Sequence, residues 1–533
     1  MVALAGLHEA GAAQNDVMMQ PDAEAAIRLT SINSNWDGLG WQPVLVRIEN
    51  RAQQARTWKF DFNVGAAHYR GGETVMTPAV ITVPSRGTSE VVVFVAGPGR
   101  SSSGSYNRTV WWGADVSGPG VAIGQVSGLS GSRQLDFAQI ATTSRMEEAV
   151  RRLMPAAPTV GHGSLPYEVE SIDPVRWPAD WRVWSSFSHL VLAGDDYDRL
   201  DGARRNALRE WVAQGGVLWI VPDGGRPGGE TPKIRHGLGW IHSRLDTLWA
   251  STGKDAILRA EPWQTVAELI TSDDRGDWEL DQPIVALIIF LVIFGIVVGP
   301  INVFVFAPVS RRQRLFVTVP ALSLGASLLL GVVIVAKDGF GGEGARRSLV
   351  VLLPGENKAA VFQQQVARTG VLLRKEFALP ADTSISLGSG GSRGVTGSRA
   401  LERAGDTASG EWFTSRAMQT HDLRRITPTR ARVELVDGGV NGRAPVVQSS
   451  VTTVLRDFRY VDAGGKRWAA ESLPPGTRVT LSPVTTEDRG DVPGFFRAYG
   501  GATDLAPLNT HASIRWKEET IIYTGRVEAA RQP

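Results

Sequence analysis

Three carboxylates within four residues are the densest chemical feature of this chain. Asp195, Asp196 and Asp198 follow the apolar run 188–194 (SHLVLAG), which predicts a buried strand. Carboxylates at this spacing suit a hard cation such as Mg²⁺ or Ca²⁺, and α/β folds place ligands at the carboxyl ends of parallel strands. The same residues suit an acidic turn that initiates a helix, because carboxylates stabilise helix N-termini. Both interpretations stay open, with the structural turn favoured.

Other catalytic chemistry has little support. The chain contains no cysteine, which excludes disulfides, thiolate metal ligands and a cysteine nucleophile. His162 and Ser164 are a histidine–serine pair, but Ser164 lacks the G-x-S-x-G frame of a serine nucleophile and precedes a Leu-Pro dipeptide typical of a loop. No glycine fingerprint for phosphates occurs. We expect no enzyme activity and no cofactor.

The acidic run lies within a segment, 121–280, where predicted strands and helices alternate. Asp201 is a suitable N-cap for a helix that ends at Gly215 and Gly216, and the apolar run 217–221 predicts the next strand. A strand, a helix and a strand joined by short connections predict a parallel sheet.

Residues 189–221, HLVLAGDDYDRLDGARRNALREWVAQGGVLWIV, resemble the glutamine-amidotransferase-like domains of bacterial envelope proteins. The resemblance implies a flavodoxin-like α/β domain over 121–280. It does not imply amidotransferase activity, because the cysteine nucleophile of active members is absent.

Two apolar runs, 284–306 and 315–336, contain no charged residue. Each is long enough to cross a hydrocarbon core of about 30 Å as a helix, so the sequence predicts a transmembrane hairpin over 283–337. The connection carries Arg311, Arg312 and Arg314. Basic short loops stay in the cytoplasm, which predicts that both flanking regions lie outside it.

The two spans contain residues suited to helix packing but none suited to proton or ion transport. Their predicted packing residues are Gly299, Pro300, Asn302, Pro320, Gly325 and Gly331. The segment 299–324, GPINVFVFAPVSRRQRLFVTVPALSL, is similar to a recurring hairpin (GP-I-N…RR…PAL) of uncharacterised bacterial membrane proteins with this domain order.

The flanking regions predict β structure. Alternation and short turns over 24–120 predict an immunoglobulin-like β-sandwich. Residues 345–533 predict a β-rich exported domain with a hairpin turn at 462–465 and a mobile loop near 386–410. Residues 1–23 are interpreted as a signal-peptide remnant or a disordered tail, and a full signal peptide would lie upstream.

The sequence thus predicts a multidomain α+β membrane protein of the bacterial inner membrane, with its N- and C-terminal domains facing the periplasm or cell exterior. The 56 basic and 54 acidic residues nearly balance, which gives no electrostatic basis for nucleic acid binding. We expect the lipid bilayer and an envelope protein or polysaccharide as partners of a non-enzymatic binding or scaffolding module. The alternative is a membrane-tethered, metal-dependent hydrolase that uses the carboxylates at 195–198.

Overall fold

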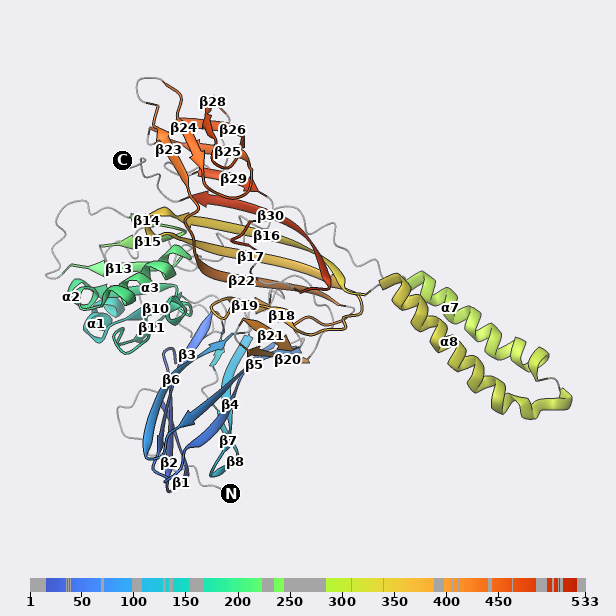
Figure 1. Ribbon diagram of the computed structural model, residues 1–533. Coiled ribbons are helices and arrows are strands. Elements are labelled where there is room, and N and C mark those ends of the chain that lie inside the picture. The colour runs from blue at the N-terminus through green and yellow to red at the C-terminus, as the bar shows by residue number, and fades with distance from the viewer. Residues whose placement is uncertain are drawn as a thin grey trace.

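The computed structural model of the chain describes residues 16–524, except 35, 37, 39, 69–70, 98–107, 128–130, 134–137, 154–166, 223–233, 244–283, 308, 339, 388–396, 405, 411, 416, 440–442, 463, 486–495, 501–502, 507 and 509–510. His162 and Ser164 lie outside the described residues, as do residues 1–15. The described chain is rich in strands, arranged in several sheets, and two apolar helices project from it (Figure 1).

Two sheets pack face to face at the N-terminal end of the molecule. One has the order β1-β2-β3-β6, and the other contains β5, β4, β7 and β8. Apolar residues alternate inward along β4, where Trp58, Phe60 and Phe62 are fully buried in the core between the sheets. The strands are β1 (Asp16–Asp22), β2 (Ala25–Ser31), β3 (Trp41–Asn50), β4 (Arg56–His68), β5 (Gly71–Val83), β6 (Gly87–Ala96), β7 (Arg108–Gly118), β8 (Val121–Ser127) and β9 (Gly131–Arg133).

These sheets extend beyond the predicted range of 24–120. The strand β1 lies within the segment interpreted as a signal remnant or tail, and it pairs antiparallel with β2. At the other end, β8 and β9 both pair with β7. The local sequence of β1 (DVMMQPD) does not alternate cleanly, so its strand conformation follows from pairing with β2.

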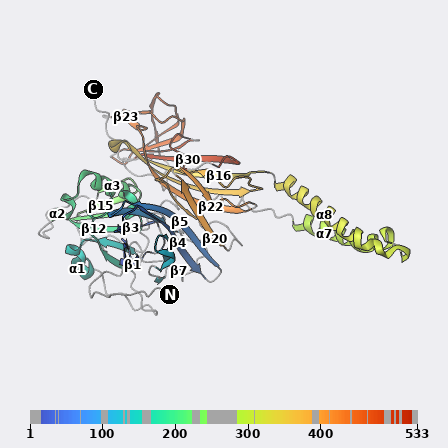
Figure 2. The ribbon, with the colours of Figure 1, turned by 60° about the horizontal axis from the view of Figure 1, so that its bottom comes forward.

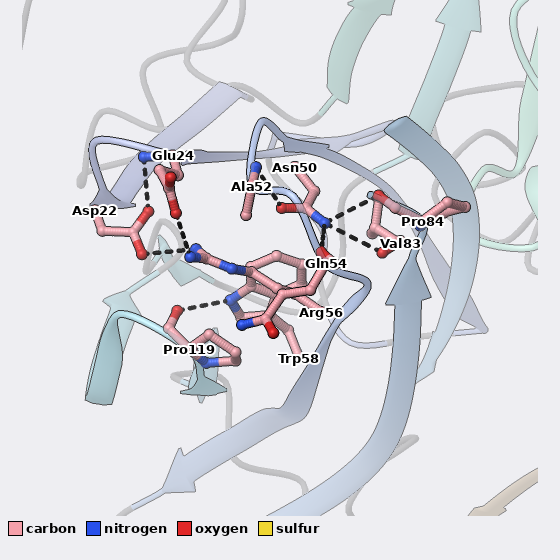
Figure 3. Close-up of polar contacts among 10 residues, drawn as sticks. All are labelled: Asp22, Glu24, Asn50, Ala52, Gln54, Arg56, Trp58, Val83, Pro84 and Pro119. Atoms are coloured by element: carbon pink, nitrogen blue, oxygen red, sulfur yellow. Dashed lines mark hydrogen bonds and ion pairs between the residues drawn. The ribbon is translucent and has the colours of Figure 1, made fainter. Parts of the chain in front are cut away.

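One end of this pair of sheets is closed by side-chain hydrogen bonds to the backbone (Figure 3). The buried Asn50 amide donates to the carbonyl oxygens of Gln54, Val83 and Pro84 at 2.9, 3.3 and 2.9 Å. Nearby, the Arg56 guanidinium binds the carboxylates of the β1–β2 turn, at 2.8 Å from Asp22 and 2.5 Å from Glu24.

A six-stranded sheet follows, in the order β11-β10-β12-β13-β15-β14. All neighbouring strands are parallel except β14, so the predicted parallel sheet is confirmed. The Asp201 side chain accepts a hydrogen bond from the Arg204 amide at 2.7 Å, as expected of the N-cap of α3. The elements are β10 (Ala138–Thr142), α1 (Ser144–Leu153), β11 (Tyr167–Ser171), η1 (Trp181–Trp184), β12 (His189–Ala193), α2 (Gly194–Asp198), α3 (Gly202–Ala213), β13 (Val217–Val221), β14 (Ile234–His236) and β15 (Gly239–His242).

The region after the two apolar helices forms a nine-stranded sheet and a small three-stranded sheet. The predicted turn at 462–465 joins the antiparallel strands β25 and β26. The elements of the region after the two apolar helices are β16 (Gly342–Leu353), η5 (Pro354–Glu356), β17 (Lys358–Thr369), β18 (Phe377–Ala378), β19 (Ser384–Leu387), β20 (Gly397–Ala404), β21 (Thr407–Gly410), β22 (Met418–Pro428), β23 (Val433–Asp437), β24 (Val446–Ser449), β25 (Leu455–Val461), β26 (Arg467–Leu473), β27 (Arg478–Thr480), β28 (Ser482–Val484), β29 (Phe496–Gly500) and β30 (Ile514–Thr524).

Three of these strands leave the C-terminal sheets and complete an N-terminal one. β20 pairs in parallel with β5, and the order β18-β21-β20-β5-β4-β7-β8 runs through both parts of the chain. The prediction of a mobile loop near 386–410 is wrong for 386–387, which belong to β19, and for 397–404 and 407–410. Its composition is poor in large apolar residues, but the edge of β5 supplies the backbone hydrogen bonds that keep it extended.

The parallel-sheet unit also packs on the nine-stranded sheet. Leu208 and Trp211 of α3 share one buried cluster with Val351 of β16 and Phe362 of β17. Lys358 forms an ion pair with Glu210 across this contact, and both side chains are largely buried. All the sheets therefore belong to one body, which we call the globular part.

The two apolar helices form a hairpin that extends away from the globular part (Figures 1 and 2). The first consists of α7 (Ile284–Ile296) and a π-helical continuation, η3 (Val297–Phe306). A 3-10 turn, η4 (Val309–Arg314), leads into the second, α8 (Leu315–Asp338). Their positions match the predicted spans 284–306 and 315–336.

The Glu210–Lys358 pair tests whether the two flanking regions pack as one body. We expect Glu210→Gln and Lys358→Met each to lower the free energy of unfolding by about 1–2 kcal/mol, and the double variant to cost clearly less than their sum, because the pair is mostly desolvated. Chemical denaturation of the purified full chain measures this coupling.

The matched control is the exposed pair Glu148 and Arg152 on α1, for which a coupling below about 0.5 kcal/mol is expected. Additive effects at Glu210 and Lys358 would contradict the packing between the two regions.

Candidate functional site: the acidic helix, the histidine pair and the apolar hairpin

Asp195, Asp196 and Asp198 lie in the short helix α2, directly after the carboxyl end of β12. The residue before this helix, Ala193, provides no side-chain cap. The carboxylates of Asp195 and Asp196 stand in the first turn, where negative charge complements the helix dipole. This placement is the one expected of a helix-initiating acidic turn.

The carboxylates are engaged by separate neighbours. Thr143 Oγ1 donates to Asp196 Oδ2 at 2.7 Å, and the Arg199 guanidinium lies 3.7 Å from the other oxygen. Asp195 instead pairs with Arg145 at 3.2 Å, and Asp198 is exposed. Within the described ranges, no group of three or more histidine, aspartate or glutamate side chains is placed to hold a metal ion. The acidic run is thus not gathered into a ligand set.

A buried histidine pair lies on one face of the parallel sheet, and no local sequence pattern indicates it. His189 begins β12 and His242 ends β15, with Trp219 of β13 between them. Trp219 stacks on His242 with 4.1 Å between ring centroids, and its Nε1 donates to His189 Nδ1 at 3.5 Å. The two histidines are 53 residues apart in the sequence, and only the strand register brings them together.

His189 is uncharged at neutral pH. Complete burial, with a smaller contribution from the neighbouring His242, lowers its pKa from 6.5 to about 4. A buried imidazole that accepts from an indole N–H packs as a neutral ring. This cluster therefore supplies a polar contact within the sheet, rather than a general acid that works near pH 7.

The hairpin exposes its apolar side chains on nearly every side. Phe304 and Phe316 are 78% and 86% exposed. The windows 288–306 and 311–332 are long and apolar enough to cross a membrane, and only 6% and 0% of them is buried within the molecule. A core helix of a water-soluble domain buries such residues, so this pattern is the one that a lipid environment would stabilise.

Among its described residues, the hairpin contains two exposed prolines and one buried polar residue. Pro300 lies within the π-helical segment η3, and Pro320 lies within α8. A proline cannot donate a backbone hydrogen bond, which distorts the regular helix around it. Asn302, in η3, is fully buried.

The glycines predicted to pack the two helices together do not lie in the contact between them. A Cβ atom added at Gly299, Gly325 or Gly331 would meet no atom within 4 Å. The contact between the two helices is therefore made by other residues, and the expectation of close packing at these glycines is not met within the hairpin. They leave small, open surfaces on its outside.

Arg311, Arg312 and Arg314 are exposed in η4, at the end of the hairpin farthest from the globular part (Figure 1). The hairpin therefore separates two polar regions: the arginine turn at one end and the sheets at the other.

Comparisons with known proteins do not identify a family. The sequence matches no protein-family model and no curated protein. A yeast delta-COP-I mu-homology domain complexed with a Dsl1 peptide is 8% identical, with 35% of this chain and 98% of that chain covered and a TM-score of 0.22. A cycloisomaltooligosaccharide glucanotransferase from Paenibacillus is 11% identical, with coverages of 36% and 27% and a TM-score of 0.18. TM-scores this low do not establish a shared fold.

Substitutions in the acidic helix distinguish a structural role of its carboxylates from a role in metal binding. Asp196→Asn should lower the free energy of unfolding by about 1 kcal/mol, because it removes the charge that faces Arg199 and weakens the bond from Thr143. Asp198→Asn, on the exposed side, is the matched control and should change stability by less than about 0.5 kcal/mol.

Thermal unfolding in Mg²⁺, Ca²⁺ or chelator should give the same Tm for the unsubstituted protein. A Tm that rises with either cation, and no longer does so in Asp195→Asn and Asp196→Asn, would instead support a metal site at α2.

The histidine pair predicts a pH dependence of stability. Between pH 6.5 and about 4, the unfolded chain binds more protons than the folded chain at His189, so the free energy of unfolding falls as the pH falls through this window. The contribution of this one residue reaches up to about 3 kcal/mol at the acidic end. In His189→Gln this part of the dependence should disappear, as measured by denaturation at pH 7.5 and pH 4.5. Equal slopes in both proteins would contradict burial of a neutral His189.

Proposed function

We propose that this chain is a bacterial inner-membrane protein, anchored by the α7–α8 hairpin, whose globular part is exported and serves as a non-enzymatic binding or scaffolding module. Its partners would be the bilayer and an envelope protein or polysaccharide. We propose neither a cofactor nor a nucleic acid partner for this chain.

The observation that carries the proposal is the parallel pairing of β5 with β20. One strand precedes the hairpin in the chain and the other follows it, and their backbones are hydrogen-bonded from Glu73–Gly397 to Met76–Ala400. Strands cannot pair through a bilayer, so both flanking regions must lie on one side. That requirement is met by an even number of crossings, and the hairpin supplies two.

The arginine turn supports the direction of insertion. Arg311, Arg312 and Arg314 lie at the tip of the hairpin, and a short basic loop is retained in the cytoplasm. The globular part would then face the periplasm or cell exterior. The absence of cysteine suits such an oxidising compartment.

Two features favour binding over catalysis. Asp195 pairs with Arg145, and Asp196 binds Thr143 and Arg199. These contacts favour a structural role for the acidic turn. The paired N-terminal sheets fit the immunoglobulin-like assignment, and such modules commonly bind or space other molecules. An amidotransferase-like α/β unit that lacks the cysteine nucleophile would likewise keep a surface for binding other molecules, but would not catalyse the amidotransferase reaction.

Single cysteines test the anchoring and its direction, because the chain has no cysteine of its own. In intact cells, a membrane-impermeant maleimide should label Val175→Cys and Lys466→Cys, which lie in the globular part on either side of the hairpin in sequence. Gln313→Cys, in the arginine turn, should be labelled only after the inner membrane is opened.

Labelling of Val175→Cys and Lys466→Cys from opposite sides would contradict the single globular part. Labelling of Gln313→Cys alone in intact cells would indicate the opposite orientation, with the globular part and its partners in the cytoplasm.

A further inference from the structure

The globular part carries an exposed apolar surface at the end where the hairpin leaves it. Phe340 and Leu373 are 67% and 77% exposed. A backbone bridge between Phe340 and Val371 places the two side chains on the same end of the molecule. We name this surface, Phe340 with residues 371–375, the membrane-facing loop.

We propose that the membrane-facing loop docks into the lipid headgroup layer of the bilayer that the hairpin crosses, with Phe340 and Leu373 in the interface and Arg374 and Lys375 at the phosphates. This inference rests on the proposed membrane anchoring. It adds a second, peripheral contact between the globular part and the membrane.

The distance along the chain supports this placement. α8 ends at Asp338, and Phe340 follows two residues later. Two residues span at most about 7 Å, and the headgroup layer on each side of the hydrocarbon core is about 5–7 Å thick. A helix that ends at the membrane surface therefore leaves Phe340 within or next to the headgroups.

The backbone directly after Phe340 is fixed in direction. Gly341 has a φ of +91°, and a Cβ atom there would lie 2.0 Å from the Ser513 carbonyl oxygen. The Gly341 amide donates to the Val371 carbonyl at 3.0 Å, and the Gly370 amide donates to the Gly341 carbonyl at 2.6 Å. Gly341 is thus hydrogen-bonded directly to the start of the membrane-facing loop.

Hydrogen bonds on both sides of Leu373 hold the loop in place and leave this side chain exposed. The Leu372 amide donates to Ser415 Oγ at 3.0 Å, and His511 Nε2 donates to the Arg374 carbonyl at 3.1 Å. Leu372 packs against the core, whereas Leu373 between these two anchors points outward. An apolar side chain displayed on a fixed backbone is expected where its environment in use is apolar.

The charges beside it suit a phospholipid surface. Arg374 and Lys375 are exposed directly after Leu373, and basic side chains at this depth interact with lipid phosphates. Glu376 is also exposed, on the side of the loop that leads back into β18. The order of apolar, basic and acidic residues thus follows the expected change from lipid to water.

Fluorescent probes on single cysteines test the proposal in the full chain, reconstituted into vesicles of phosphatidylcholine and anionic phosphatidylglycerol that carry nitroxide lipids. Probes at Phe340→Cys and Leu373→Cys should lose fluorescence with headgroup-level nitroxide. A probe at Leu324→Cys, within α8, should lose it with mid-chain nitroxide. A probe at Val175→Cys, an exposed aliphatic position on the globular part, should be unaffected by either.

The outcomes separate the two proposals. Quenching at Leu324→Cys without quenching at positions 340 and 373 would overturn the docked loop and leave the anchoring intact. No quenching at Leu324→Cys would overturn both.

A second variant tests whether the loop, rather than the probe, enters the lipid. Arg374→Glu with Lys375→Glu should reduce quenching at Leu373→Cys, because reversed charges repel the phosphates. Unchanged quenching would show that the apolar probe inserts by itself, and would overturn the proposal.

Discussion

The structure depends on the backbone edge of β5, which is completed by a strand encoded more than 300 residues later. An unpaired strand edge exposes a row of hydrogen-bonding groups and invites pairing with other chains. Here β20 pairs with that edge, and β21 and β18 extend the sheet further. Because the apolar hairpin lies between β5 and β20 in sequence, the chain must leave the globular part and return to it before the sheet can close.

Features with a local signal were predictable from the sequence. The helix after Asp201 has an N-cap, a regular apolar stripe and terminal glycines, and the structure places α3 there. The two uncharged runs predicted the hairpin helices for the same reason: length and composition are properties of a continuous segment. The turn at 462–465 carries its own glycine signal and joins β25 to β26.

Features that depend on register were not predictable. β20 reads as a loop because its own residues do not indicate a strand, and only the edge of β5 makes it one. His189 and His242 become neighbours through the parallel order of β12, β13 and β15. The carboxylates at 195–198 illustrate the opposite case. Their spacing suggested shared chemistry, but Asp195 and Asp196 bind different partners and Asp198 is exposed.

Register also connects the apolar hairpin to the sheets. β16 begins at Gly342, soon after α8 ends, and runs parallel to β30. Ion pairs link the two strands at Glu343–Arg515, Arg346–Glu518 and Arg347–Glu519.

Arg346 is the central member of this series. Its guanidinium lies 3.8 Å from the ring centre of Trp516, and burial lowers its pKa to about 10 while Glu518 opposes that change. A charge desolvated this far remains stable only while its partners keep their positions, so the pair resists sliding of β16 against β30. A displacement of α8 would therefore move β16 and β30 together. The nine-stranded sheet should respond to such a displacement as a rigid body.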